Sequence, residues 1–83
     1  MITQDELARR IKDALPDAQV ATRDLTGTAD HYAIDVISAR FEGLASLQRH
    51  RLVHAALRDV LGGPLHAIEL VTRSADEAAR TTT

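Results

Sequence analysis

The amino-acid sequence predicts one small α/β (α+β) domain with the element order α-β-β-α-β-α. Three observations support this fold class. The chain has 83 residues, which suffices for one hydrophobic core and not for two. Its apolar residues recur with helical spacing in some segments and with strand alternation in others, and glycine or proline separates most of these segments. We expect a mixed three-stranded sheet with the helices packed on one face.

The first helix is expected over residues 4–15. Thr3 and Glu6 have the spacing of a capping box, and apolar residues follow at positions 7, 11, 14 and 15. Pro16 ends the helix, because proline lacks an amide donor and disfavours helical geometry in the preceding residue. A first strand, with weaker periodicity, is expected over residues 18–24.

A hairpin is expected to join this strand to a second one over residues 32–37. The turn is the stretch TGTAD, at residues 26–30. Strand alternation then places three apolar side chains on the core face, namely Tyr32, Ile34 and Val36. His31 has the opposite parity, so it is expected at the mouth of the turn, within reach of solvent or a partner.

The main helix is expected over residues 47–61, with Ser46 as its N-cap and Gly62-Gly63-Pro64 as its stop signal. Its predicted broad apolar face is made of Leu47, His50, Val53, His54, Leu57, Val60 and Leu61. A last strand follows over residues 65–72, parallel to its neighbour because a helical crossover separates the two.

A short terminal helix is expected over residues 75–80, since Ser74 and Glu77 form a second capping box. Residues 81–83 have nothing to bury and are expected to fray. The whole chain, residues 1–83, is read as a single domain with about residues 3–80 ordered.

Composition excludes several classes of function. With no cysteine, the chain cannot supply a thiolate ligand, a disulfide or a thiol nucleophile. One Tyr and one Phe are too few aromatics for a single-strand stacking platform. The net charge of −2 argues against a basic surface over the whole domain. Neither a targeting leader nor a membrane span is recognised, so a cytoplasmic protein is expected.

The four histidines are the main candidates for chemistry. His50 and His54 have the i, i+4 spacing that can hold one metal ion, but their apolar neighbours favour partly buried core-face residues. His66 lies where the glycine-rich loop enters the last strand, and it is either a functional residue or a structural one that packs with Ile68. No catalytic triad, carboxylate pair or phosphate-binding glycine loop is recognised, so an enzyme is not predicted.

The sequence Arg49-His50-Arg51 is a candidate cluster for phosphate contacts, because guanidinium groups offer planar paired donors. Arg58 is predicted to lie near Arg51 on the polar side of the same helix. The alternative is a solvated helix edge whose charge is balanced by nearby acidic residues, and the negative net charge favours it.

Three segments resemble the BolA family: HYAIDVISARFEG, LQRHRLVHAAL and LHAIEL. They fall within residues 31–70 and cover about half of the chain. The resemblance implies an α/β fold similar to the type II KH arrangement. It also implies a non-enzymatic adaptor that pairs with a monothiol, CGFS-type glutaredoxin and shares a [2Fe–2S] cluster with that partner and glutathione.

The resemblance assigns one iron ligand to His66. The second family ligand is a Cys or His in the loop between the first two strands, where this chain has Thr28; His31 is the imidazole nearest that loop and the candidate substitute. A cluster is expected only in the complex and not in the isolated chain, which is expected to be a monomer or weak dimer without membrane contact. Binding by neutral imidazole should weaken at acid pH.

Two alternatives stay open. Some members of the family are described as DNA-binding regulators of cell shape, stress response or biofilm formation. The chain has no Gly-x-x-Gly backbone clamp, so DNA binding would rest on Arg49, Arg51 and Arg58. The plainer alternative is a protein-interaction module in which the histidines are structural.

Overall fold

The computed structural model describes residues 2–81 and confirms the predicted order of elements. The helices are α1 (Gln4–Ala14), α2 (Ser46–Ala56) and α3 (Ala75–Thr81), with a short 3-10 turn, η1, at Ala39–Phe41. The strands are β1 (Gln19–Asp24), β2 (His31–Ile37) and β3 (Ala67–Arg73). Helix α3 extends one residue past its predicted end, and the predicted fraying of residues 82 and 83 concerns positions outside the described residues.

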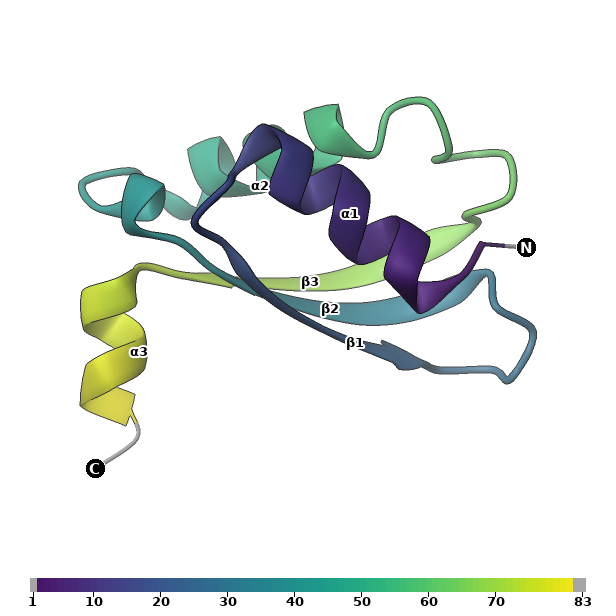
Figure 1. The fold of residues 1–83 in the computed structure, drawn as a ribbon, viewed down its shortest axis with the longest axis horizontal. Coiled ribbons are helices and arrows are strands. Elements are labelled where there is room, and N and C mark those ends of the chain that lie inside the picture. Colours follow the sequence, from purple (N-terminus) through teal and green to yellow (C-terminus); the bar gives the residue numbers. More distant parts are fainter. Residues whose placement is uncertain (1, 82–83) are drawn as a thin grey trace.

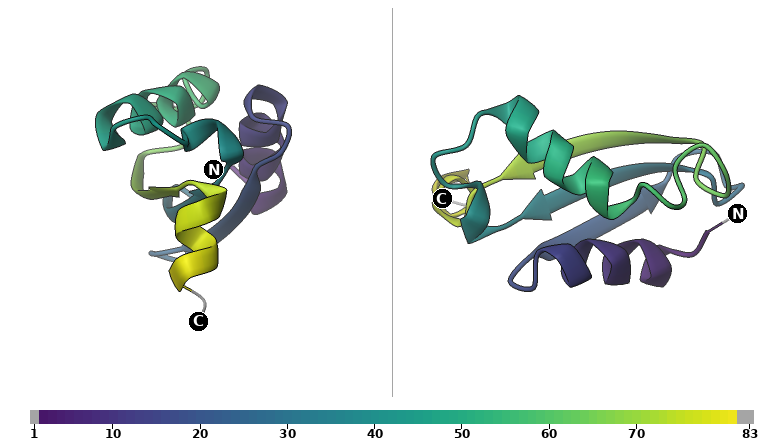
Figure 2. Two further views of the ribbon diagram at one scale, coloured as in Figure 1. Left: turned by 90° about the vertical axis from the view of Figure 1, so that its left-hand side faces the viewer. Right: turned by 90° about the horizontal axis from the view of Figure 1, so that it is seen from above.

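The sheet is mixed, as predicted, with β2 at its centre. Strand β1 pairs with β2 antiparallel through the hairpin, and β3 pairs with β2 parallel after the crossover through α2. Helices α1 and α2 cover one face of the sheet, whereas α3 lies beyond the end of β3 and points away from them (Figures 1 and 2). The prediction that the helices share one face therefore holds for α1 and α2 but not for α3, whose N-cap Ser74 directly follows β3.

The core lies between the sheet and these two helices. Strand alternation buries Tyr32, Ile34 and Val36 almost completely, as predicted. The helical and loop residues that pack against them are Leu7, Ile11, Leu15, Phe41, Val53, Leu57, Val60 and Leu65. Within the described residues, the helices lack the length and apolarity that a membrane crossing requires.

Helix α2 is shorter than predicted. It ends at Ala56, and residues 57–60 continue as turns, so helical spacing cannot be extrapolated to residue 61. The backbone carbonyl of Ala45, not that of Ser46, begins the helix; Ala45 is the N-cap, and its N–H donates to Gln48 Oε1 at 3.1 Å. The prediction of Ser46 as N-cap was wrong.

The predicted apolar face of this helix is correspondingly only half right. Val53, Leu57 and Val60 are buried, and His50 is half-buried. Leu47 is 62% exposed, Leu61 is 36% exposed and His54 is exposed. Leu47 and His54 lie on the exposed side of α2, and Leu61 lies beyond its C-terminal end.

The terminal helix is held to the rest of the fold by Glu77. Its carboxylate accepts a hydrogen bond from Ser74 N at 2.8 Å, and Ser74 Oγ accepts from Glu77 N at 3.1 Å, which confirms the second capping box. Glu77 Oε1 also accepts from Arg49 Nη1 at 2.6 Å. The Arg49 and Ser74 hydrogen bonds lower the pKa of the Glu77 carboxyl to about 2 from its usual 4.5.

Replacing Glu77 by glutamine is expected to make protein stability less sensitive to acid. Because the pKa of Glu77 is lower in the folded chain, its stabilising contribution is fully present above pH 4.5 and is lost as the pH falls toward about 2. The melting temperatures of wild type and Glu77→Gln should therefore differ most near neutral pH and converge in acid. The control is Asp76→Asn, at an exposed site on the same helix, with a smaller effect near neutral pH. A difference that stays constant down to pH 2 contradicts this role.

Candidate two-histidine site

The structure brings the two predicted ligands, His31 and His66, into contact. His31 is the first residue of β2, and it pairs with Ala67 in the parallel register of β2 and β3. His66 immediately precedes Ala67, so the start of β3 places it beside His31. The two ring centroids are 4.8 Å apart and the ring planes are tilted by 54°. The pair lies at the end of the sheet opposite α3 (Figure 1).

The backbone of Asp30 fixes this juxtaposition. Its carbonyl oxygen accepts hydrogen bonds from His66 N at 2.7 Å and from Ala67 N at 3.2 Å. These bonds hold the entry of β3 against the entry of β2. The backbone of His66 is therefore hydrogen-bonded to the residue that directly precedes His31.

The loop before His66 directs its ring to the surface. Gly62 has a φ of 88°, a left-handed conformation that glycine adopts without strain, and its N–H donates to Leu65 O at 2.8 Å. Leu65 is completely buried and anchors the loop, whereas His66 is exposed. The structural alternative, in which His66 packs with Ile68 inside the protein, does not agree with this exposure. His31 is half-buried, with 36% of its side chain exposed.

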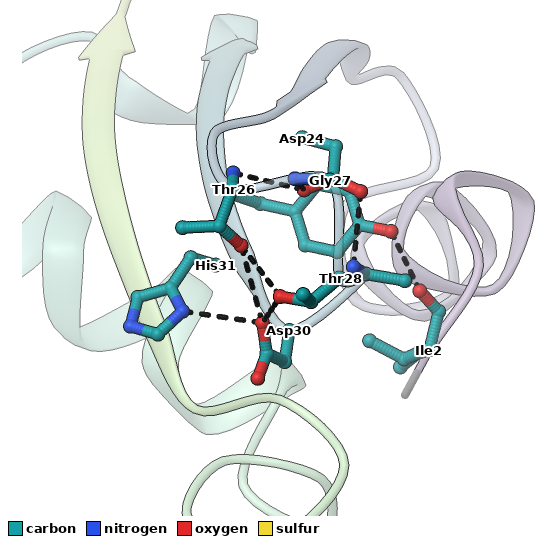
Figure 3. A network of polar contacts seen from close by, with 9 residues as sticks. Ile2, Asp24, Thr26, Gly27, Thr28, Asp30 and His31 are labelled. Atoms are coloured by element: carbon teal, nitrogen blue, oxygen red, sulfur yellow. Dashed lines mark hydrogen bonds and ion pairs between the residues drawn. The ribbon is translucent and has the colours of Figure 1, made fainter.

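The loop between β1 and β2 is organised by Asp24. Its Oδ1 accepts from Thr26 N at 3.2 Å and Gly27 N at 2.9 Å, and its Oδ2 accepts from Ala29 N at 3.0 Å (Figure 3). One carboxylate thus satisfies three backbone donors of the turn. The N-terminal segment supports the same loop, because Ile2 N donates to Ala29 O at 2.9 Å.

The side chain of Asp30 connects this loop to His31. Its Oδ1 lies 3.2 Å from His31 Nδ1 and also accepts from the hydroxyl groups of Thr28 and, at 3.4 Å, Thr26 (Figure 3). The Thr28 hydroxyl and the His31 ring lower the pKa of the Asp30 carboxyl, which favours its ionised form. Thr28 therefore takes part in the polar network around His31.

His31 and His66 offer two imidazole rings side by side. Two neutral imidazoles are nitrogen ligands of the kind that iron and zinc accept. Within residues 2–81, there is no group of three or more His, Cys, Asp or Glu side chains placed to hold a metal ion. A four-coordinate metal held by His31 and His66 would need two ligands besides these imidazoles. Because the chain has no cysteine, it could not supply a thiolate as one of them.

The other two histidines differ from this pair. His50 is half-buried and His54 is exposed on α2, so the prediction that both are core-face residues was wrong for His54. Their i, i+4 spacing stays a sequence feature, and the described residues around them do not complete a metal-binding group.

The three arginines of the alternative site have different surroundings. Arg49 has only 11% of its side chain exposed: besides Glu77, it donates from Nε to Leu44 O at 2.8 Å and lies over the Phe41 ring at 5.9 Å from the centroid. Arg49 is therefore committed to the fold. Arg51 and Arg58 are exposed and remain available to an anionic partner.

Fold and site together define a small α+β domain of the BolA type, with a histidine at the entry of its parallel edge strand. The family model described as "BolA-like protein" matches residues 7–77. The chain belongs to the BolA family.

Individual relatives agree with this assignment. The chain is 56% identical over 48 residues to human BolA-like protein 1; the match covers 58% of this chain and 35% of the relative, about a third of its length. It is 37% identical over 73 residues to the uncharacterized protein RP812 of Rickettsia prowazekii, covering 88% of this chain and 95% of the relative. The chain is also 39% identical over 51 residues to a DNA-binding transcriptional regulator BolA from Vibrio cholerae. This match covers 61% of this chain and 48% of the relative.

Solved structures show the same fold. The structure of a bolA protein homologue from Coxiella burnetii superimposes with a TM-score of 0.83 and 31% sequence identity, covering 96% of this chain and 100% of that chain. The predicted fold class and family are both confirmed.

Proposed function

We propose that this chain is an adaptor that pairs with a monothiol, CGFS-type glutaredoxin and offers His66 and His31 as nitrogen ligands to a [2Fe–2S] cluster. The glutaredoxin and glutathione would supply the sulfur ligands. The observation that supports this most strongly is the pair of adjacent imidazoles, 4.8 Å apart, in a chain without cysteine. Membership of the BolA family, which comprises non-enzymatic regulators and adaptors, is consistent with such a role.

The chemistry of the ligands favours a shared site. A chain that offers two imidazoles cannot retain a cluster by itself, but it can complete one presented by a thiolate partner. Two neutral nitrogen ligands in place of thiolates remove negative charge from the cluster and raise its reduction potential, as in Rieske centres. When bound, the cluster would supply the iron–sulfur unit that is carried or sensed. The protein itself supplies two imidazoles at the starts of adjoining strands. The His66 side chain is exposed and the His31 side chain is half-buried.

The test combines the chain, a CGFS glutaredoxin, glutathione, ferrous iron and sulfide under anaerobic conditions. We expect a cluster with visible absorption and circular dichroism that differ from those of the glutaredoxin with glutathione only. Double replacement of His31 and His66 by alanine should abolish the difference, and the control His54→Ala should preserve it, since His54 is exposed on α2. Spectra that are the same with and without this chain would reject the proposal and favour a plain interaction module with structural histidines.

A second candidate function is DNA binding. It is supported by the exposure of Arg51 and Arg58, by the lack of any acidic residue within α2, and by the similarity to the Vibrio cholerae regulator. Because Arg49 is engaged by Glu77, we assign the phosphate contacts to the two exposed arginines.

Duplex DNA titrations at two salt concentrations test this candidate. If both arginines contact phosphates, Arg51→Ala with Arg58→Ala should weaken binding and reduce the slope of log affinity against log salt by about two. Arg23→Ala removes an exposed arginine from β1 and serves as the control. Affinity that does not depend on salt, or that both sets of variants lower equally, contradicts a specific role for α2.

A further inference from the structure

Asp30 contacts both histidines, and this position suggests a role in addition to the roles of the two proposed ligands. Its backbone carbonyl accepts from His66 N, and its carboxylate contacts His31 Nδ1 at 3.2 Å. Asp30 thus holds the backbone of His66 and the ring of His31. Without these two contacts, Asp30 would be an ordinary solvated residue of the turn.

The contact with the ring has a chemical consequence. A neutral imidazole carries one proton, and the hydrogen bond made by one ring nitrogen decides which nitrogen holds it. A carboxylate is an acceptor only, so the Asp30 contact favours the proton on His31 Nδ1. The lone pair then lies on Nε2, which becomes the atom able to bind a metal. Carboxylates orient metal-binding histidines in this way in many metal sites.

We infer that Asp30 is a positioning residue that fixes the His31 ring with its proton on Nδ1 and makes Nε2 the metal donor. The hydroxyl of Thr28 contributes by donating to the same carboxylate oxygen, supported by Thr26, whose hydroxyl lies 2.6 Å from that of Thr28 (Figure 3). Thr28 therefore supports the ring of His31 through the carboxylate of Asp30. This inference rests on the proposed function for its metal and on the geometry of the free chain for its orientation.

The first test uses the isolated chain and needs no metal. In protein labelled with ¹⁵N, the ring nitrogens of His31 should show the Nδ1-protonated tautomer at mildly alkaline pH. Asp30→Ala should shift His31 away from this tautomer while its backbone carbonyl still accepts from His66 N, so the His66 ring is an internal control with no expected change. If Asp30→Ala fails to fold, Asp30→Leu takes its place, because the leucine side chain is similar in shape to that of aspartate. Asp13→Asn removes an equal charge from the exposed surface of α1.

A His31 tautomer that is the same in wild type and in a folded Asp30 variant would overturn the inference. The second test repeats the assembly with glutaredoxin, glutathione, iron and sulfide. We expect Asp30→Ala to lower the cluster yield by about 10–100-fold, the range for loss of an outer ligand partner. An unchanged yield and spectrum despite a changed tautomer would overturn the role toward the metal. Failure of wild type to form any cluster would reject the proposed function, and the tautomer result would then still decide whether Asp30 orients His31.

Discussion

Replacing Leu57 by alanine is expected to lower the free energy of unfolding by about 2–5 kcal/mol. Leu57 is completely buried, at the C-cap of α2 and within the core cluster. Its truncation removes apolar contacts and leaves a cavity that the surrounding structure fills only in part. A chain of 83 residues is expected to have a total stability of about 4–12 kcal/mol, so this loss is a large part of it. Urea unfolding followed by far-ultraviolet circular dichroism measures it.

Leu47→Ala is the matched control, because it makes the same chemical change near the other end of α2. Helical spacing placed both leucines on one apolar face, but Leu47 is 62% exposed in the structure. We therefore expect Leu47→Ala to cost less than about 0.5 kcal/mol. Similar costs at the two positions would contradict the difference in burial between Leu47 and Leu57.

The second large effect is expected on the cluster. His66→Ala and His31→Ala, tested singly, should each lower the yield of the mixed cluster by at least about tenfold, since losing a ligand costs no less than losing its outer partner. The free proteins should keep their fold, because His66 is exposed and His31 is half-buried. Visible circular dichroism of the assembled complex, normalised to iron content, is the readout.

The two single variants also separate the proposal from its alternatives. If only His66 is a ligand, His31→Ala leaves the yield at the wild-type level. If both histidines are structural, each variant shifts the melting temperature and neither changes the cluster spectrum. His50→Ala provides a control at a half-buried histidine of α2 outside the pair.

Much of the fold could be predicted from the sequence because its local signals agree with one another. The capping residues Thr3 and Ser74 mark two helix starts that the structure confirms. The alternation from Tyr32 to Val36 identifies the buried face of the central strand. The end of α2 could not be predicted, since Leu57 and Val60 are buried whether they lie in a helix or in the turns that follow it.

The site was predictable in part. The resemblance to the family pointed to His66, and the strand parity of His31 placed it at the mouth of the turn. That the two rings meet depends on the parallel register of β2 and β3, which no local pattern specifies. The polar network was missed, although the sequence from Asp24 to Asp30, DLTGTAD, has the Asp, Thr and Gly residues typical of side-chain-stabilised turns. Arg49 was taken for a surface residue because its partner, Glu77, is 28 positions away.

In the proposed complex, His31 and His66 would both be ligands of the shared cluster. Pulsed electron paramagnetic resonance of the reduced complex tests it most directly, with the histidines of this chain alone labelled with ¹⁵N. We predict couplings from two ¹⁵N nuclei in wild type and from one in either single alanine variant. A reduced cluster that forms in the complex but shows no ¹⁵N coupling from this chain would contradict the claim.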